Sequence, residues 1–149
     1  MQPFMPNLTQ NLRAFCALLE RGETLAAIER FYANDVCVFE NRELARAGRE
    51  QCLAYERAAL ERVKSRPRFK LHRTAADEAN QVAFIEYTVR FVSASGRPMR
   101  LEEVAVQSWE GDHIVNERFY YEGLVDEGDE AQHDDSERAT DEYPNPTEG

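Results

Sequence analysis

The stretch LEEVAVQSWEGDHIVNERFYYE, residues 101–122, carries the most informative pattern of the chain. Apolar and polar residues alternate on both sides of Glu110-Gly111-Asp112-His113, which is typical of two antiparallel strands joined by a tight turn. One face of this hairpin must therefore be packed. The other face mixes acids, amides and an arginine with aromatic residues, a composition that suits neither solvent nor a plain core. We interpret this face as the wall of a pocket.

Upstream of the hairpin, helical and alternating patterns follow one another in a regular order. Helical spacing of apolar residues, with stops at Gly22 and before Pro67, predicts helices at residues 8–21, 24–33 and 49–64. Alternation predicts strands at 36–40, 68–76, 81–93, 99–110 and 113–121. The expected order is α-α-β-α-β-β-β-β, which makes this an α+β protein.

Length and composition limit the class of protein. A chain of 149 residues with 42% hydrophobic content suits one domain with a core. No segment is apolar and long enough to span a membrane, and the N-terminus lacks a signal-peptide pattern, so we expect a cytoplasmic protein without a membrane partner. Cys16, Cys37 and Cys52 have no metal-ligand spacing and are expected to be buried free thiols, so no metal site is predicted.

The acidity of the chain is concentrated near its end. Residues 123–149 carry ten acids and one arginine, so they hold nearly all of the net charge of −10. We expect residues 1–122 to form the domain and residues 123–149 to be a disordered acidic tail. The alternative is an arm that binds a partner or folds over a neighbouring subunit. The domain has no basic stripe, so no nucleic-acid partner is expected.

The two longest strands each have an apolar face and a mixed face. If both mixed faces were exposed, a large apolar patch would be exposed with them. We therefore predict that the mixed faces line a concave pocket. The apolar faces would then be buried in a homodimer, through Ile85, Tyr87, Val89, Val104 and Val106. The alternative is a two-layer α+β domain in which Glu86 and Arg90 are simply solvated.

Several segments, taken in order, resemble a known superfamily. They are ANDVCVFE at 33–40, GRE at 48–50 and GDHIVNERFYYE at 111–122. Together with the element order, they resemble the nuclear-transport-factor-2-like superfamily, and within it the SnoaL-like branch of polyketide cyclases and ketosteroid isomerases. The resemblance covers residues 8–122. It implies a cone-shaped, curved antiparallel sheet packed on three helices around a pocket, usually dimeric and without metal or organic cofactor.

The resemblance also implies positions for catalytic groups. The general base of the isomerases is an acid at the end of the first strand, where this chain has Glu40. A carboxylate in an apolar pocket has a raised pKa that suits proton transfer near neutral pH. The oxyanion donors of that branch align with Phe15 and Ala105, which cannot donate. Ketosteroid isomerisation is therefore rejected as the specific activity.

Other polar residues on the predicted concave face are candidates for the same site. Besides Glu40, we select Arg118 and Tyr120 as catalytic candidates. The candidates for ligand binding are Phe15, Phe84, Glu86, Arg90, Glu103, Gln107, Trp109 and Asn116. The superfamily's epoxide hydrolases use an acid, an arginine and an acid, which Glu86 with Arg90 or Arg118 matches by residue type only. A structural network of buried charges is the alternative, and the face of His72 is undetermined.

Two functions are compatible with these residues. The first is a cofactor-independent acid/base isomerase, cyclase, dehydratase or hydrolase that acts on a small apolar carbonyl or hydroxylated compound, with Glu40 moving the proton. The second is a non-catalytic ligand-binding or dimerisation module. The first requires a Glu40 carboxylate with a raised pKa and access to the cavity. A Glu40 that is locked to a buried arginine would argue against it.

Overall fold

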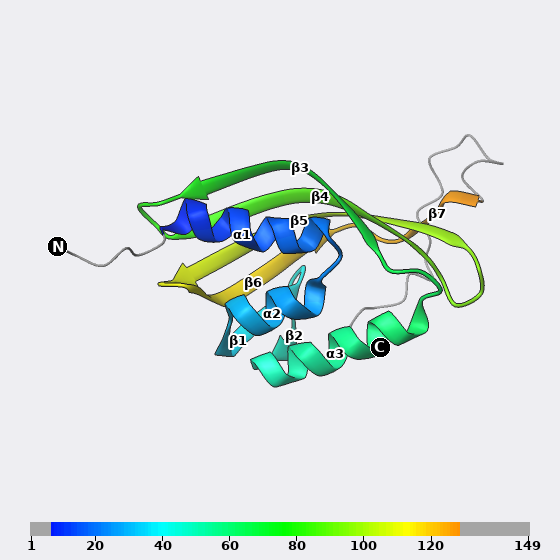
Figure 1. The fold of residues 1–149 in the computed structure, drawn as a ribbon, viewed down its shortest axis with the longest axis horizontal. Coiled ribbons are helices and arrows are strands. Elements are labelled where there is room, and N and C mark those ends of the chain that lie inside the picture. Colours follow the sequence, from blue (N-terminus) through cyan, green and yellow to red (C-terminus); the bar gives the residue numbers. More distant parts are fainter. Residues whose placement is uncertain (1–6, 129–149) are drawn as a thin grey trace.

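The computed structural model describes residues 7–128 and shows three helices over one face of a curved sheet (Figure 1). The helices are α1 (Leu8–Glu20), α2 (Thr24–Phe31) and α3 (Arg49–Arg62). The strands are β1 (Tyr32–Glu40), β2 (Glu43–Ala47), β3 (Arg68–Asp77), β4 (Val82–Val92), β5 (Pro98–Glu110), β6 (His113–Tyr121) and β7 (Val125–Asp126). The expected α+β class, with a curved sheet packed on three helices, is confirmed.

The sheet has the strand order β2-β1-β6-β5-β4-β3, and β7 pairs with β5. All these pairs are antiparallel except β1 with β6, which is parallel. The sequence did not predict β2 or β7. Strand β2 has only five residues at an edge of the sheet, and β7 has two, so neither carries enough alternation to be recognised.

Helix α1 begins at a capping box and presents one apolar stripe to the sheet. The Asn7 side chain accepts a hydrogen bond from the backbone N–H of Gln10, and the Gln10 side chain accepts one from the backbone N–H of Asn7. Leu8, Leu12 and Phe15 are buried on the stripe. The helix ends before Gly22, whose φ of 75° lies in the left-handed region that favours glycine.

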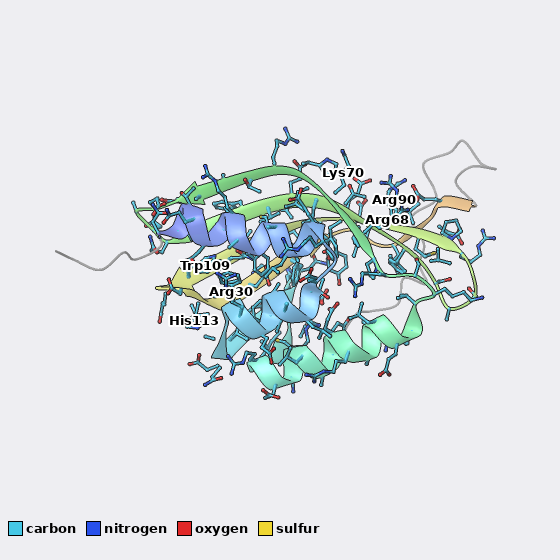
Figure 2. The ribbon with its side chains drawn as sticks, viewed as in Figure 1. Arg30, Arg68, Lys70, Arg90, Trp109 and His113 are labelled. Atoms are coloured by element: carbon cyan, nitrogen blue, oxygen red, sulfur yellow. The ribbon has the colours of Figure 1, made fainter. Side chains whose placement is uncertain are left out.

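Three aromatic rings connect the helices to the sheet. Phe31 of α2 packs edge-to-face against Phe15 of α1, with 5.9 Å between ring centroids, and against Trp109 of β5, with 5.6 Å. Figure 2 shows Trp109 between the helices and the sheet. Phe31 is only 2% exposed, so these contacts fix α1, α2 and β5 relative to one another.

A β-bulge in β6 sets which residues of that strand face the helices. Trp109 pairs with Ile114, but the preceding Ser108 pairs with Asn116, so Val115 is an extra residue without a partner. Strict alternation from Ile114 would turn Asn116 and its even-numbered successors inward. After the bulge the odd-numbered residues face inward instead, and Glu117 is buried beside Gln107.

The structure also corrects the face assigned to β4. Ile85 pairs with Ala105 and Tyr87 pairs with Glu103, and directly paired residues of neighbouring strands point to the same side of a sheet. The apolar face of β4 therefore lies on the concave side. Ile85, Tyr87 and Val89 are buried within the chain, so they cannot form the predicted homodimer surface.

The end of the described chain packs near the turn that connects β4 and β5. Glu127 pairs with Arg90 and Arg100, and Asp126 pairs with Arg97. Residues 123–128 of the expected tail are thus placed against the sheet, and residues 129–149 lie outside the described residues. Within residues 7–128, none of the helices is long and apolar enough to cross a membrane.

We predict that Phe31→Ala lowers the free energy of unfolding by about 3–5 kcal/mol, because it leaves a cavity between Phe15 and Trp109. Leu44→Ala is the control, since Leu44 lies on the edge strand β2 and is 55% exposed; we expect a loss of about 0.5 kcal/mol or less. Urea unfolding followed by circular dichroism measures both. Similar losses for the two variants would contradict this description of the core.

Candidate functional site

A cavity of about 680 Å³ lies between the concave face of the sheet and the three helices. Most of its wall is apolar and comes from all three helices and from the long strands. Representative apolar residues of the wall are Phe15, Leu19, Ile28, Leu60, Phe69, Ile85, Leu101 and Phe119. Four glutamates of the wall interrupt this surface: Glu40, Glu56, Glu103 and Glu117. The cavity therefore suits a small, mainly apolar ligand with a polar group.

Glu103 is an acid of the cavity wall whose pKa lies close to neutral pH. It lies at the middle of β5, where Tyr87 of β4 is its direct partner. Burial raises the pKa of Glu103 to about 8, although a short hydrogen bond donated by the Tyr87 hydroxyl to Oε1 opposes that rise. Negative charge on Glu40 and Glu117 adds to the rise. At pH 7 the carboxyl is mainly protonated.

Glu117 is the most deeply buried of the acids. It is 1% exposed, its Oε2 accepts a hydrogen bond of 2.7 Å from Gln107 Nε2, and its Oε1 shares a short hydrogen bond with the Tyr32 hydroxyl. Burial raises the pKa of Glu117, while these hydrogen bonds and the charge of Arg46 partly offset the rise. Burial also raises the pKa of Tyr32 well above its ordinary value, and the Glu117 carboxylate adds to this.

Glu40 is held by an arginine that the sequence did not single out. Arg46 Nη2 of β2 lies 2.9 Å from Glu40 Oε2, both side chains are buried, and the guanidinium stacks 4.0 Å above the Tyr55 ring. Burial alone would lower the pKa of Arg46, but the charge and hydrogen bond of Glu40 raise it. This ion pair is the arrangement that argues against Glu40 as a free general base.

One nitrogen of the Arg46 guanidinium makes no hydrogen bond to the described part of the chain. Nη1 is buried and finds no hydrogen-bond partner among residues 7–128. An orphaned buried donor costs about 1–3 kcal/mol, so an oxygen of a ligand or of a water molecule is expected to satisfy it. Arg46 is thus a group in the wall of the cavity that favours an electron-rich oxygen nearby.

The remaining acid lies between two helices. Thr24 Oγ1, at the start of α2, donates a hydrogen bond of 2.6 Å to Glu56 Oε2 of α3. Burial raises the pKa of Glu56, and the hydrogen bond from Thr24 opposes the rise. The cavity is also lined by Ser93, just after β4, by Met99, near the start of β5, and by Leu124, just before β7.

Five of the candidates from the sequence lie on the concave side. Phe15, Glu40 and Glu103 line the cavity. Gln107 and Trp109 are fully buried behind it, where the Trp109 Nε1–H donates a hydrogen bond of 3.0 Å to Gln107 Oε1.

The β4 candidates lie on the opposite, outer face, and the expectation that they line the pocket is wrong. Phe84 is exposed, and Glu86 forms a bidentate ion pair with Arg73 at 2.6 and 3.1 Å. Arg90 pairs with Glu127 and, as Figure 2 shows, lies near Arg68 and far from Trp109. The prediction for these residues is wrong because it assigned the mixed face of β4, rather than its apolar face, to the cavity.

The β6 candidates are also on the outer face, because the bulge at Val115 reverses the alternation. Asn116 pairs with Ser108, and Tyr120 is 51% exposed. The Arg118 guanidinium stacks 4.3 Å above the Phe39 ring and donates a hydrogen bond to the Asn41 carbonyl. The acid and arginine pattern proposed from Glu86, Arg90 and Arg118 is therefore not a cavity feature.

Sequence reasoning missed Tyr32, Arg46, Tyr87 and Glu117 as members of the site. Tyr87 was assigned to the outer face together with its strand, and Glu117 became inward-facing only through the bulge. Arg46 lies on the unrecognised strand β2. A bulge leaves little trace in a single sequence; the clearest available signal was Tyr87, an aromatic residue with a polar tip on an otherwise apolar face.

The cysteines and His72 stand apart from this chemistry. All three cysteines are free; Cys16 and Cys52 are buried, which raises the pKa of their thiols to about 12 and about 11, and Cys37 is half-buried. His72 Nε2 lies 2.7 Å from Thr88 Oγ1, on the outer face of the sheet. Across the described part of the chain, no three His, Cys, Asp or Glu residues group as metal ligands.

Comparison with known proteins finds similar folds but no similar sequences. No protein-family model matches the chain, and no curated protein matches it. Among solved structures, a nuclear-transport-factor-2-like protein of Anabaena variabilis is 15% identical, with a TM-score of 0.66, covering 81% of this chain and 93% of that one. A Jannaschia protein assigned to the SnoaL-like polyketide cyclases is 14% identical, with a TM-score of 0.65, covering 81% and 91%.

An LEH-like epoxide hydrolase of M. tuberculosis is 18% identical to this chain, with a TM-score of 0.63, and the match covers 80% of this chain and 85% of that one. At these identities the likeness concerns the fold. The resemblance found in the sequence is therefore confirmed: this chain has the nuclear-transport-factor-2-like fold of the SnoaL-like proteins.

We predict that Glu103 makes the stability of the protein depend on pH. Its pKa is about 8 in the folded chain and 4.5 ordinarily, so between these values unfolding releases a proton. Stability should therefore fall as pH rises from about 4.5 to about 8. Glu103→Gln should remove part of that fall and exceed the wild type at pH 8 by about 2–4 kcal/mol, with little difference at pH 4.5.

Thermal and urea unfolding across this pH range measure the effect. Glu102→Gln is the matched control, because Glu102 is next to Glu103 on β5 but exposed. A slope should remain in Glu103→Gln, since burial also raises the pKa of Glu117 and Glu56. Parallel pH curves for the wild type and Glu103→Gln would show that Glu103 is not protonated in the folded protein.

Proposed function

We propose that this protein is a cofactor-independent acid/base catalyst that acts on a small, largely apolar carbonyl or hydroxylated compound bound in the cavity. The observation that carries the proposal is Glu103, a carboxyl with a pKa of about 8 in a mainly apolar cavity. A group with a pKa near the working pH both gives and accepts a proton efficiently. Glu103 therefore takes the role that the sequence assigned to Glu40.

The surrounding residues support proton transfer at carbon. The Tyr87 hydroxyl holds Glu103 Oε1, which leaves Oε2 for the substrate. In its ionised form Glu103 removes a proton from a carbon next to a substrate carbonyl, and in its protonated form it returns that proton to the same or another carbon. The positive charge of Arg46 favours the negative charge that develops on the substrate oxygen.

The structural neighbours support acid/base chemistry on small molecules, and their names include more than one reaction. One is assigned to the polyketide cyclases and another is an epoxide hydrolase. Attack of water on an epoxide is a second candidate reaction. Glu40, Arg46 and Glu103 all line the cavity, and both members of the Glu40–Arg46 ion pair act electrostatically on Glu103. Together they supply the acid, arginine and acid of that reaction. This set replaces the outer-face residues that the sequence suggested for the same role.

The proposed activity is tested without knowledge of the natural substrate by proton exchange in 2-tetralone, a bicyclic ketone. In D₂O, the wild type should speed deuterium incorporation next to the carbonyl, and the rate should rise with pH and level off above about pH 8, as Glu103 ionises. Glu103→Gln should lower this rate by about 10²-fold or more. Proton NMR measures the incorporation.

Glu102→Gln controls for the change of charge and should keep the wild-type rate. Equal exchange by Glu103→Gln and the wild type would reject the proposal. Binding of 2-tetralone without any acceleration of exchange would favour the alternative, a non-catalytic ligand-binding module. Hydration of styrene oxide by the same variants would select the epoxide reaction instead.

We further propose that the protein forms a homodimer through the outer face of the sheet, with Val104 and Val106 as expected and with Phe84 and Tyr120 in place of the β4 residues Ile85, Tyr87 and Val89. Phe84 and Val104, which are 40% and 36% exposed, lie with Tyr120, 51% exposed, on neighbouring strands. Val104 pairs directly with Tyr120, and Phe84 with Val106, so these four apolar side chains are contiguous. A second copy would cover a patch that is otherwise left to solvent.

Val104→Glu should convert the dimer to a monomer, because it places a charge at the centre of this patch. Sedimentation velocity at micromolar protein concentration measures the change. Leu44→Glu is the control, since Leu44 is also exposed but lies on β2 at the edge of the sheet. A monomeric wild type, or dimers of both variants, would reject this surface.

A further inference from the structure

One acid of the cavity wall is not used by the chemistry proposed above. Glu56 lies on α3 and lines the cavity where α3 runs beside α2, on the helix side of the chamber (Figure 1). Glu103 lines the same cavity from β5, on the sheet side. A ligand that fills the space between the helices and the sheet can therefore contact Glu56 at one side and Glu103 at the other.

A single hydrogen bond holds the Glu56 carboxyl in place. Thr24 Oγ1 lies 2.6 Å from Glu56 Oε2, a distance typical of a hydroxyl that donates to an ionised carboxylate. This bond favours the charged form of Glu56 and opposes the rise in its pKa that burial causes. Among residues 7–128, no side chain donates a hydrogen bond to Oε1. That oxygen is available to a ligand.

Glu56 also has no cation of its own within the described chain. Arg46 acts electrostatically on Glu56, but its guanidinium lies 2.9 Å from the Glu40 carboxylate and is paired with it. Arg62 also lines the cavity, but it is exposed at the end of α3, and no ion pair joins it to Glu56. A carboxylate among apolar residues is costly without a counterion, so a positive charge on the ligand would stabilise it.

The other polar groups of the wall favour the same sign of charge on the ligand. The hydroxyls of Thr24, Tyr32 and Tyr87 are each hydrogen-bonded to a glutamate of the wall. Four carboxyls line the cavity, whereas only two cations do so among the described residues, and one of these is paired with Glu40. The wall therefore offers a ligand acceptor oxygens and negative charge.

We propose that Glu56 binds an ammonium group of the substrate, and that the substrate is therefore a small, largely apolar amine. The ammonium donates to Oε1 of Glu56 while Thr24 holds Oε2, and the apolar body of the molecule fills the cavity toward Glu103. The inference rests on the proposed function for the reaction at Glu103. Glu56 determines specificity in this scheme and takes no part in proton transfer.

The hydrogen bond between Thr24 and Glu56 also joins α2 to α3, and a carboxyl with that role alone would need no charge. The variant Glu56→Gln separates the two roles, because its side-chain oxygen still accepts the hydrogen bond from Thr24 while its charge is lost. If Glu56 only joined the helices, this variant would bind every ligand as the wild type does.

Calorimetry near neutral pH with three ligands of one shape tests the assignment. They are 2-aminotetralin, which is positively charged, 2-tetralol, which is a neutral donor, and tetralin, which has neither group. Glu56→Gln should weaken binding of the amine by about 10-fold or more, because a hydrogen bond to a charged group is lost. Binding of 2-tetralol should weaken by about 3-fold at most. Binding of tetralin should stay unchanged, which also shows that the cavity of the variant is intact.

Glu61→Gln is the matched control, since Glu61 lies on the same helix but is exposed and outside the cavity wall. It should keep the wild-type affinity for all three ligands. The inference is overturned if Glu56→Gln binds 2-aminotetralin as tightly as the wild type, or if it weakens the amine and 2-tetralol by the same factor. Equal weakening of the amine and tetralin would also overturn it.

Failure of amine recognition and failure of the proposed reaction give different results. If the wild type does not accelerate exchange in 2-tetralone but Glu56→Gln selectively weakens the amine, the proposed function fails and the amine site stands. If Glu103→Gln rather than Glu56→Gln causes the selective loss, the ammonium binds at Glu103 and the role of Glu56 is overturned. If the wild type binds none of the three ligands, both proposals fail.

Discussion

One unpaired residue in β6 determines the chemistry of the cavity. The bulge at Val115 reverses the alternation of the strand, so Glu117 and Phe119 face the helices, and Arg118 and Tyr120 face outward. Without it, the concave wall would carry an arginine and an amide and would lack its most buried acid. The hydrogen bonds that connect Trp109, Gln107, Glu117 and Tyr32 exist only because Gln107 and Glu117 are direct partners on this face.

The fold could be predicted from the sequence because its signals are local and repeated. Helical stripes such as that of Leu8, Leu12 and Phe15, and the long alternating strands, gave three helices and the main strands in the right order. The faces of the strands are a different kind of information. They depend on pairing between strands, and a single extra residue such as Val115 inverts them without changing the local pattern.

For the same reason, the candidate site could be predicted only in part from the sequence. Glu40 and Glu103 lie at the cavity as the sequence indicated, but their roles depend on neighbours that are distant in the chain. Glu40 is neutralised by Arg46, from a short edge strand with no recognisable alternation, whereas Glu103 has only tyrosine as its hydrogen-bond donor. The two carboxylates therefore differ in their contacts, because Glu40 is hydrogen-bonded to a guanidinium and Glu103 to a tyrosine hydroxyl.

The ionic contacts that hold residues 124–127 have a consequence for the shape of the cavity. Leu124 forms part of the cavity wall, yet its segment is attached through Arg90, Arg97 and Arg100 at the surface rather than through the aromatic core. Substitutions there alter the size and shape of the chamber and leave the aromatic contacts of Phe15, Phe31 and Trp109 in place. The segment that carries this variation therefore lies outside the strands that carry the wall acids Glu40, Glu103 and Glu117.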